Sequence, residues 1–330
     1  MNLDLLRRKR VRRLGIRSAG YSGQRRIFFI LDRATRRFPG DLGLWAQYIE
    51  YARQQKSFKK LSSIFTDALR LHPTNADLWI YAAEYALDDH ADMTQSRSYM
   101  QRGLRFCKSS KQLWVHYGKL ELIYIAKLIA RRRILGLDKV EPTEPEQEAG
   151  FDDPNADMIA LPKVTGEDVM PSNVEKDGID NVALQNLAST PALSGAIPLA
   201  IFDSGTKHFN NDDRFGQEYF NMVYGFEQVP CLHRILEHIV EVMRQTKPGS
   251  YRTHICYTKV PVAGVLVTSP EFPPALGVSL ARLKEHGPDR NLAQEAINWL
   301  QPLEKTENLD PALQKVIAAT IRSAERTLQR

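Results

Sequence analysis

The sequence predicts an all-α fold, a solenoid of stacked helical hairpins that is interrupted by an acidic disordered linker. Three tryptophans recur at intervals of 34 and 35 residues, and each follows a leucine: Trp45, Trp79 and Trp114. This period is typical of helix-pair repeats, in which each unit buries its apolar face only against its neighbours. The second observation is an acidic, proline-containing stretch at 138–180, which breaks the pattern.

Each repeat is predicted to contain two helices. Apolar residues three and six positions after each tryptophan indicate one buried stripe on the first helix. Six residues before the tryptophans lie Pro39, Pro73 and Lys108, and proline there separates one pair from the next because it cannot continue a helix. The alternative for the tryptophans is a cofactor-binding or base-stacking role. The expected repeat core comprises Trp45, Tyr48, Tyr51, Phe65, Ala68, Leu69, Trp79, Tyr85, Leu104, Trp114 and Tyr117.

The stretch at 138–180 divides the chain. Thirteen Asp and Glu residues against three lysines give it a charge of about −10, and Phe151 is its one aromatic residue. High charge with low hydrophobicity cannot offset the entropy of ordering, so a disordered linker is predicted. We expect five regions: a basic arm at 1–23, a repeat array at 24–137, the linker at 138–180, a second helical block with a degenerate repeat at 181–246, and a partly helical region at 247–330.

The C-terminal region is the hardest part to interpret. Residues 247–278 are rich in proline and β-branched residues and indicate no clear element. Two short helices are expected near 291–304 and 311–329.

Positive charge is concentrated near the start of the chain. The net charge is only +6, but residues 1–40 hold twelve Lys and Arg against Asp4 and Asp32. Such a basic run is typical of a nuclear import signal or a nucleic-acid contact, and the alternative is a solvated helix face. A second basic cluster ends a long helix, where cations also gain from the helix dipole. The candidate import or RNA contacts are Arg7, Arg8, Lys9, Arg10, Arg12, Arg13, Arg131, Arg132 and Arg133.

Motifs that carry chemistry are missing from the sequence. It holds no phosphate-binding loop, dinucleotide fingerprint or nucleophile elbow. His233, Glu237 and His238 have a spacing that fits no zinc helix. Three cysteines without a CxxC pair indicate buried or inert thiols in a reducing compartment. No apolar run is long enough to span a membrane. We expect no enzyme activity, cofactor, metal, membrane association or small-molecule substrate.

A family pattern is visible in the repeats. It runs through the unit that begins with Trp45 as Trp45-x-x-Tyr48 with Tyr51, then Ile64-Phe65-x-x-Ala68-Leu69 and Pro73. This pattern resembles the HAT (half-a-tetratricopeptide) repeat, which is found in RNA-processing proteins. The runs at 23–51, 69–85, 100–106 and 120–137 resemble a HAT-repeat family of the small-subunit processome, and the piece at 190–205 resembles the segment that follows its linker.

The resemblance implies a HAT/TPR-like solenoid that acts as a non-catalytic scaffold. It implies a role in nucleolar pre-rRNA processing with U3 small nucleolar RNA, and a nuclear and nucleolar location. The implied partners are processome proteins, including WD-repeat proteins, with U3 RNA and pre-rRNA contacted directly or indirectly. The alternatives are a direct RNA-binding protein that uses the basic clusters and a TPR-like cytoplasmic adaptor. The family has a longer N-terminal region, so the chain is expected to begin inside the family's sequence.

Overall fold

The chain is helical wherever its structure is described. The computed structural model describes residues 20–134, 191–285, 289–306 and 309–329, together with Lys9, Arg13 and Gly287. Within these ranges there are helices and no strand, which confirms the all-α prediction. The expected linker at 138–180 lies outside the described residues.

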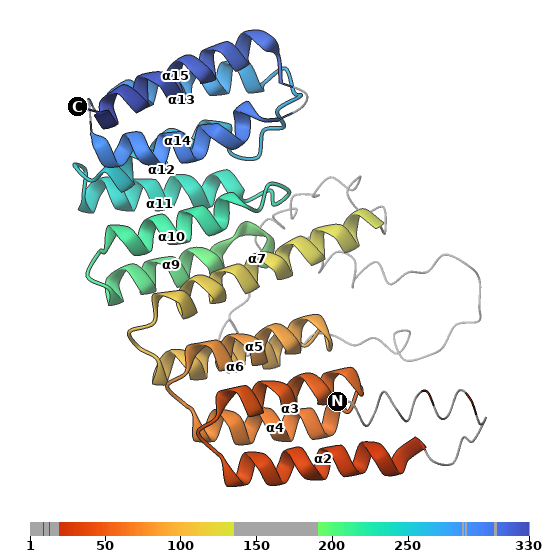
Figure 1. Ribbon diagram of the computed structural model, residues 1–330. Coiled ribbons are helices and arrows are strands. Elements are labelled where there is room, and N and C mark those ends of the chain that lie inside the picture. Colours follow the sequence, from red (N-terminus) through yellow and green to blue (C-terminus); the bar gives the residue numbers. More distant parts are fainter. Residues whose placement is uncertain are drawn as a thin grey trace, which may run out of the picture.

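Successive helices stack side by side into an elongated array (Figure 1). Long side-by-side packing of helix pairs is the architecture that the repeat period predicts. The N-terminal helices are α2 (Gly20–Arg37), α3 (Leu42–Gln54), α4 (Phe58–Leu71), α5 (Ala76–Asp88), α6 (Met93–Phe106) and α7 (Lys111–Ile134). After residue 190 come η3 (Pro191–Ser194), α9 (Ala196–His208), α10 (Asp213–Tyr224), α11 (Leu232–Thr246), α12 (Tyr251–Lys259), η4 (Val260–Val262), α13 (Phe272–Glu285), α14 (Arg290–Glu304) and α15 (Pro311–Gln329).

Short polar residues start several of these helices. The Asp41 carboxylate accepts hydrogen bonds from the backbone N–H groups of Gly43 and Leu44, and the Asn75 side chain accepts from Leu78. Such caps satisfy N–H groups that have no partner inside the helix. Each cap follows a turn that begins at a proline, Pro39 or Pro73, so the predicted break between repeat units coincides with a helix start.

The interruption at 135–190 falls inside one helical hairpin. Helix α7 precedes it and α9 follows it, yet the two helices pack against each other as a pair. Gly118 on α7 also lies against the ring of Tyr219 on α10, and Gly205 on α9 lies against Trp114. One hydrophobic core therefore runs from α3 to α12 and includes α7, α9 and part of α14. The described helices of the ranges 24–137 and 181–246 share this core.

The region at 247–330 continues the same pattern of helix pairs. Helices α13, α14 and α15 bury a second cluster that contains Phe272, Leu280, Trp299 and Ile317. Two of the prolines that obscured this region in the sequence lie at a helix start, since Pro273 and Pro274 fall in the first turn of α13. Proline is tolerated there because the first N–H groups of a helix have no intrahelical partner. Helices α14 and α15 occupy the two ranges in which the sequence predicts helices.

Candidate partner-binding surfaces

The first two repeat tryptophans are structural. Trp45 and Trp79 are 4% and 5% exposed, so neither ring is available to stack on a base. The indole N–H of Trp45 donates to the carbonyl of Pro39 at 2.9 Å, and that of Trp79 donates to the carbonyl of Pro73 at 2.8 Å. The proline six residues upstream therefore both ends the preceding pair and supplies the acceptor that orients the indole.

Trp114 differs from the other two. Its ring is only half-buried, and its indole nitrogen has no hydrogen-bond partner among the described residues. The carbonyl at the matching position belongs to Lys108, and His208 Nε2 lies 2.8 Å from that oxygen. The His208 ring also stacks on Trp114, with centroids 5.9 Å apart. His208 of α9 therefore contacts both the turn carbonyl and the tryptophan ring of this unit.

The other predicted core residues can be placed one by one. Leu104 is half-buried, so it lies at the edge of the core. The buried members are Tyr48, Tyr51, Phe65, Ala68, Leu69, Tyr85 and Tyr117.

The predicted basic contacts lie in two places. Within the N-terminal run, Lys9 and Arg13 are described and exposed, whereas Arg7, Arg8, Arg10 and Arg12 lie outside the described residues. The other cluster occupies the last turn of α7, which extends beyond the neighbouring helices (Figure 1). There Arg131 and Arg133 are exposed and Arg132 is half-buried. The α7 end is thus a cationic projection from the stack.

A buried ion pair links the second and third units. Arg97 on α6 donates through Nε and Nη2 to the two carboxylate oxygens of Glu121 on α7, both at 2.7 Å. Glu121 is 1% exposed, and its hydrogen bond with Arg97 is the main cause that raises the pKa of the guanidinium. The sequence does not reveal that the Glu121 carboxylate is buried.

Three equivalent grooves lie between successive second helices. A groove of about 440 Å³ lies between α2 and α4, with Trp45 and Tyr48 of α3 among its lining residues. Its central counterpart between α9 and α11 holds only about 10 Å³, since Met243 there lies against Gly216 of α10. Of these three grooves, the two open ones lie near the two ends of the described array.

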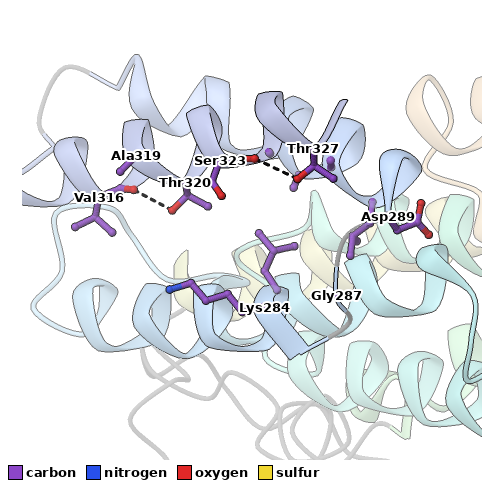
Figure 2. A pocket seen from close by; sticks show the side chains of 13 residues that line it. Lys284, Gly287, Asp289, Val316, Ala319, Thr320, Ser323 and Thr327 are labelled. Carbon is purple, nitrogen blue, oxygen red and sulfur yellow. Dashed lines mark hydrogen bonds between the residues drawn. The ribbon is translucent and has the colours of Figure 1, made fainter. Parts of the chain in front are cut away.

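The largest of these grooves lies between α13 and α15, with α14 beneath it, and has a volume of about 510 Å³ (Figure 2). Small side chains such as Ala293, Ala296 and Ala319 leave it open. Thr320 Oγ1 donates to the Val316 carbonyl at 2.9 Å, so its hydroxyl is satisfied within α15. Among the described lining residues only Lys284 and Asp289 are charged. An apolar groove of this size suits a peptide segment or a helix of a partner.

The histidine, cysteine and glutamate side chains named in the sequence analysis can be placed in the structure. The described residues contain no group of three or more His, Cys, Asp or Glu side chains arranged to hold a metal ion. His238 Nε2 instead pairs with Asp203 Oδ1 at 2.8 Å. Cys256 is fully buried, and burial raises the pKa of its thiol to about 12. Among the described helices, none combines the length and apolar character needed to cross a bilayer.

Comparison with known proteins identifies the repeats. Residues 25–127 match the family model described as the PRP39 N-terminal HAT repeat. The match bears out the predicted resemblance to HAT repeats over this range. The burial of Trp45 and Trp79 shows how these HAT-like units are packed.

The curated relatives that this chain matches are all named U3 small nucleolar RNA-associated protein 6 or a homolog of it. The chain is 35% identical over 181 residues to U3 small nucleolar RNA-associated protein 6 of Schizosaccharomyces pombe, which covers 52% of this chain and 37% of the relative. It is 27% identical over 135 residues to the Homo sapiens homolog, or 38% of this chain and 22% of the relative. The Dictyostelium discoideum homolog is 30% identical over 126 residues, 38% of this chain and 20% of the relative. The matched part is thus well under half the length of these relatives.

Proposed function

We propose that this chain is a non-catalytic scaffold subunit of the small-subunit processome. It would act with U3 small nucleolar RNA in nucleolar pre-rRNA processing and small ribosomal subunit biogenesis. The observation that carries the proposal is the 35% identity over 181 residues to a protein named for its association with U3 RNA. The fold supports it, because the buried aromatic repeat residues join successive helices into one extended stack.

The mechanism is multivalent positioning. The two open grooves, α2/α4 and α13/α15, lie in units far apart along the array, so separate protein segments can occupy them at once (Figure 1). Binding at one groove raises the effective concentration of a linked partner at the other. Processome proteins, including WD-repeat proteins, are the partners that we propose for these grooves.

The proposal is tested by purifying the tagged chain from its own cells and identifying bound RNA by sequencing and bound proteins by mass spectrometry. We expect enrichment of U3 RNA and of processome proteins, and nucleolar fluorescence of the tagged chain. Recovery without U3 RNA, or a purely cytoplasmic signal, would contradict the scaffold and favour a cytoplasmic adaptor.

A groove variant sharpens this experiment. Ala319→Arg places a long charged side chain at the α13/α15 groove, whereas Ala281→Arg adds the same side chain at an exposed position of α13 that does not line the groove. We expect Ala319→Arg to lose a subset of the bound proteins and Ala281→Arg to retain them. Equal recovery by both variants would remove this groove from the mechanism.

Direct RNA binding is the second candidate, and the cationic end of α7 favours it. Each phosphate contact to a single strand contributes about 0.7 to the slope of log K against log salt. Replacement of Arg131, Arg132 and Arg133 by glutamine should therefore flatten that slope if they hold RNA. Neutralising Arg7–Arg13 should reduce RNA affinity or nuclear import. If the RNA affinity of the unmodified chain does not change with salt concentration, direct RNA binding is excluded and the scaffold function remains.

A further inference from the structure

The outward side of α2 carries arginines around an exposed phenylalanine. Helix α2 lies at one end of the stack (Figure 1) and packs onto α3 through its inner side, where the Phe28 ring lies 5.1 Å from that of Tyr51. On the other side no described helix covers it. We call this face the α2 stripe, and its members are Arg25, Arg26, Phe29, Arg33, Arg36 and Arg37, all exposed.

The spacing of these residues makes the stripe one continuous surface. At 3.6 residues per turn its members span an arc of about 120°. Phe29 lies three or four positions from Arg25, Arg26 and Arg33, so these four side chains are neighbours on the helix surface. Phe29 is 64% exposed, so its ring is accessible on this face. The ring is thus a π-face surrounded by cations.

The positive charge of the stripe is poorly compensated. Arg36 pairs with Asp32 at 2.8 Å, but among the described residues no carboxylate lies within ion-pair distance of Arg25, Arg26, Arg33 or Arg37. Like charges at neighbouring helix positions repel one another and destabilise the helix. Such a cluster is therefore stabilised by an anionic partner that brings several negative charges along one line.

We propose that the α2 stripe binds single-stranded RNA, with its arginines on the phosphates and the Phe29 ring stacked on a base. Phosphates occur at regular intervals along a strand, and an unpaired base offers the flat face that an exposed phenyl ring needs. The carboxylates of the acidic segment at 138–180 are an alternative source of negative charge for the arginines. This segment has Phe151 as its single aromatic residue, so it offers few flat groups that could stack on the Phe29 ring. The stripe is separate from the clusters at 7–13 and 131–133.

The test uses the purified full chain and a fluorescein-labelled single-stranded RNA of about twenty nucleotides, followed by fluorescence anisotropy at several salt concentrations. The triple variant Arg25→Gln, Arg26→Gln, Arg33→Gln should lower the slope of log K against log salt by about 2. Phe29→Ala should weaken binding about five-fold or more and leave that slope unchanged, because stacking releases no counterions.

Matched controls separate local contacts from general effects. The triple variant Arg70→Gln, Arg102→Gln, Arg105→Gln removes the same charge from exposed positions of α4 and α6. Phe58→Ala removes an exposed phenyl ring from α4. Both should bind RNA with nearly unchanged affinity. Circular dichroism should show equal helix content in all four proteins, since every altered side chain is exposed.

Two outcomes would overturn the inference. One is an α2 triple variant that loses no more affinity than its control triple. The other is an unchanged affinity of Phe29→Ala together with stronger RNA binding after deletion of 138–180, which would assign the stripe to the acidic segment. Neither outcome touches the scaffold proposal, because the assay uses the purified chain without partners.

Discussion

The two regular repeat units and the interrupted unit use different side chains to contact the turn carbonyl that precedes each first helix. In the α3/α4 unit the Pro39 carbonyl accepts the Trp45 indole N–H and lies 2.7 Å from His72 Nε2. In the α5/α6 unit the Pro73 carbonyl accepts the Trp79 indole N–H, and Cys107 Sγ lies 3.4 Å away. In the α7/α9 unit His208 Nε2 lies 2.8 Å from the Lys108 carbonyl, and the Trp114 indole N–H does not bond to this oxygen.

The difference shows what defines a repeat in this chain. The turn carbonyl before each first helix is held by the end of the second helix in all three units, whatever lies between the two helices. The connection between the two helices is residues 89–92 in the α5/α6 unit and residues 135–195 in the α7/α9 unit. Loop-closure entropy grows only logarithmically, so roughly four doublings of length cost about 2–3 kcal/mol. Packing between α7, α9 and α10 offsets such a cost.

The largest expected effect comes from the tryptophans themselves. Trp79→Ala removes a buried ring and its hydrogen bond, so we expect a loss of about 3–5 kcal/mol in the free energy of unfolding. Trp114→Ala should cost clearly less, because that ring is half-buried and its N–H has no partner among the described residues. Chemical denaturation followed by circular dichroism measures both. Equal losses would show that the interrupted unit is as tightly packed as the regular one.

The next effect tests the junction between the regular and interrupted units. Arg97→Ala leaves the Glu121 carboxylate, which is 1% exposed, without its partner, so we expect a loss of about 3 kcal/mol. The double variant Arg97→Met, Glu121→Leu should recover most of this stability, because it leaves no unpaired buried charge. Urea denaturation of the three proteins decides the point. A double variant as unstable as Arg97→Ala would mean that packing, not the charge, dominates.

A smaller effect tests contact across the interruption. A methyl group at Gly118 would lie 2.6 Å from Cζ of Tyr219, whose ring is fully buried and whose hydroxyl donates to the Pro198 carbonyl at 2.8 Å. Gly118→Ala should therefore cost about 1–3 kcal/mol by overpacking. Thermal unfolding measures the loss, and Gly277→Ala, which meets nothing within 4 Å, is the matched control. A neutral Gly118→Ala would indicate that α7 and α10 are not tightly packed.

The smallest effect concerns the histidines at the turn carbonyls. His208→Ala removes a hydrogen-bonding group and a ring stacked on Trp114, whereas His72→Ala removes a hydrogen-bonding group only. We expect losses of about 1 kcal/mol, with His208→Ala the larger. Differential scanning calorimetry of both variants in the same buffer compares the two losses. The reverse order would show that the regular unit depends more on this bond.

The sequence predicted the helices that have strong periodicity. The spacing of Trp45 and Trp79 identified the HAT units, because a bulky residue recurring at a fixed period can only be buried by stacked neighbours. It did not reveal that α7 pairs with α9, since the pairing depends on contacts such as Trp114 with Gly205 and His208, which are far apart in the chain. Proline obscured α13, although Pro273 and Pro274 are tolerated in its first turn.

The candidate surfaces were less accessible from the sequence. The α2 stripe could have been found, since its arginines recur at helical spacing around Phe29. The α13/α15 groove could not, because it arises where Ala293 and Ala296 of α14 meet Ala319 of α15. Small residues in separate segments give no signal until the helices are placed beside one another.

The position of the interruption inside a hairpin makes this chain a natural split protein. Fragments 1–134 and 191–330 would each present one half of the α7/α9 interface as bare apolar surface, with Leu120 on one piece and Phe202 on the other. Produced separately, each half should aggregate or stay partly unfolded, and mixing should restore a stoichiometric complex. Such reassembly would turn a single polypeptide into a two-component system in which each fragment folds only when the other is nearby.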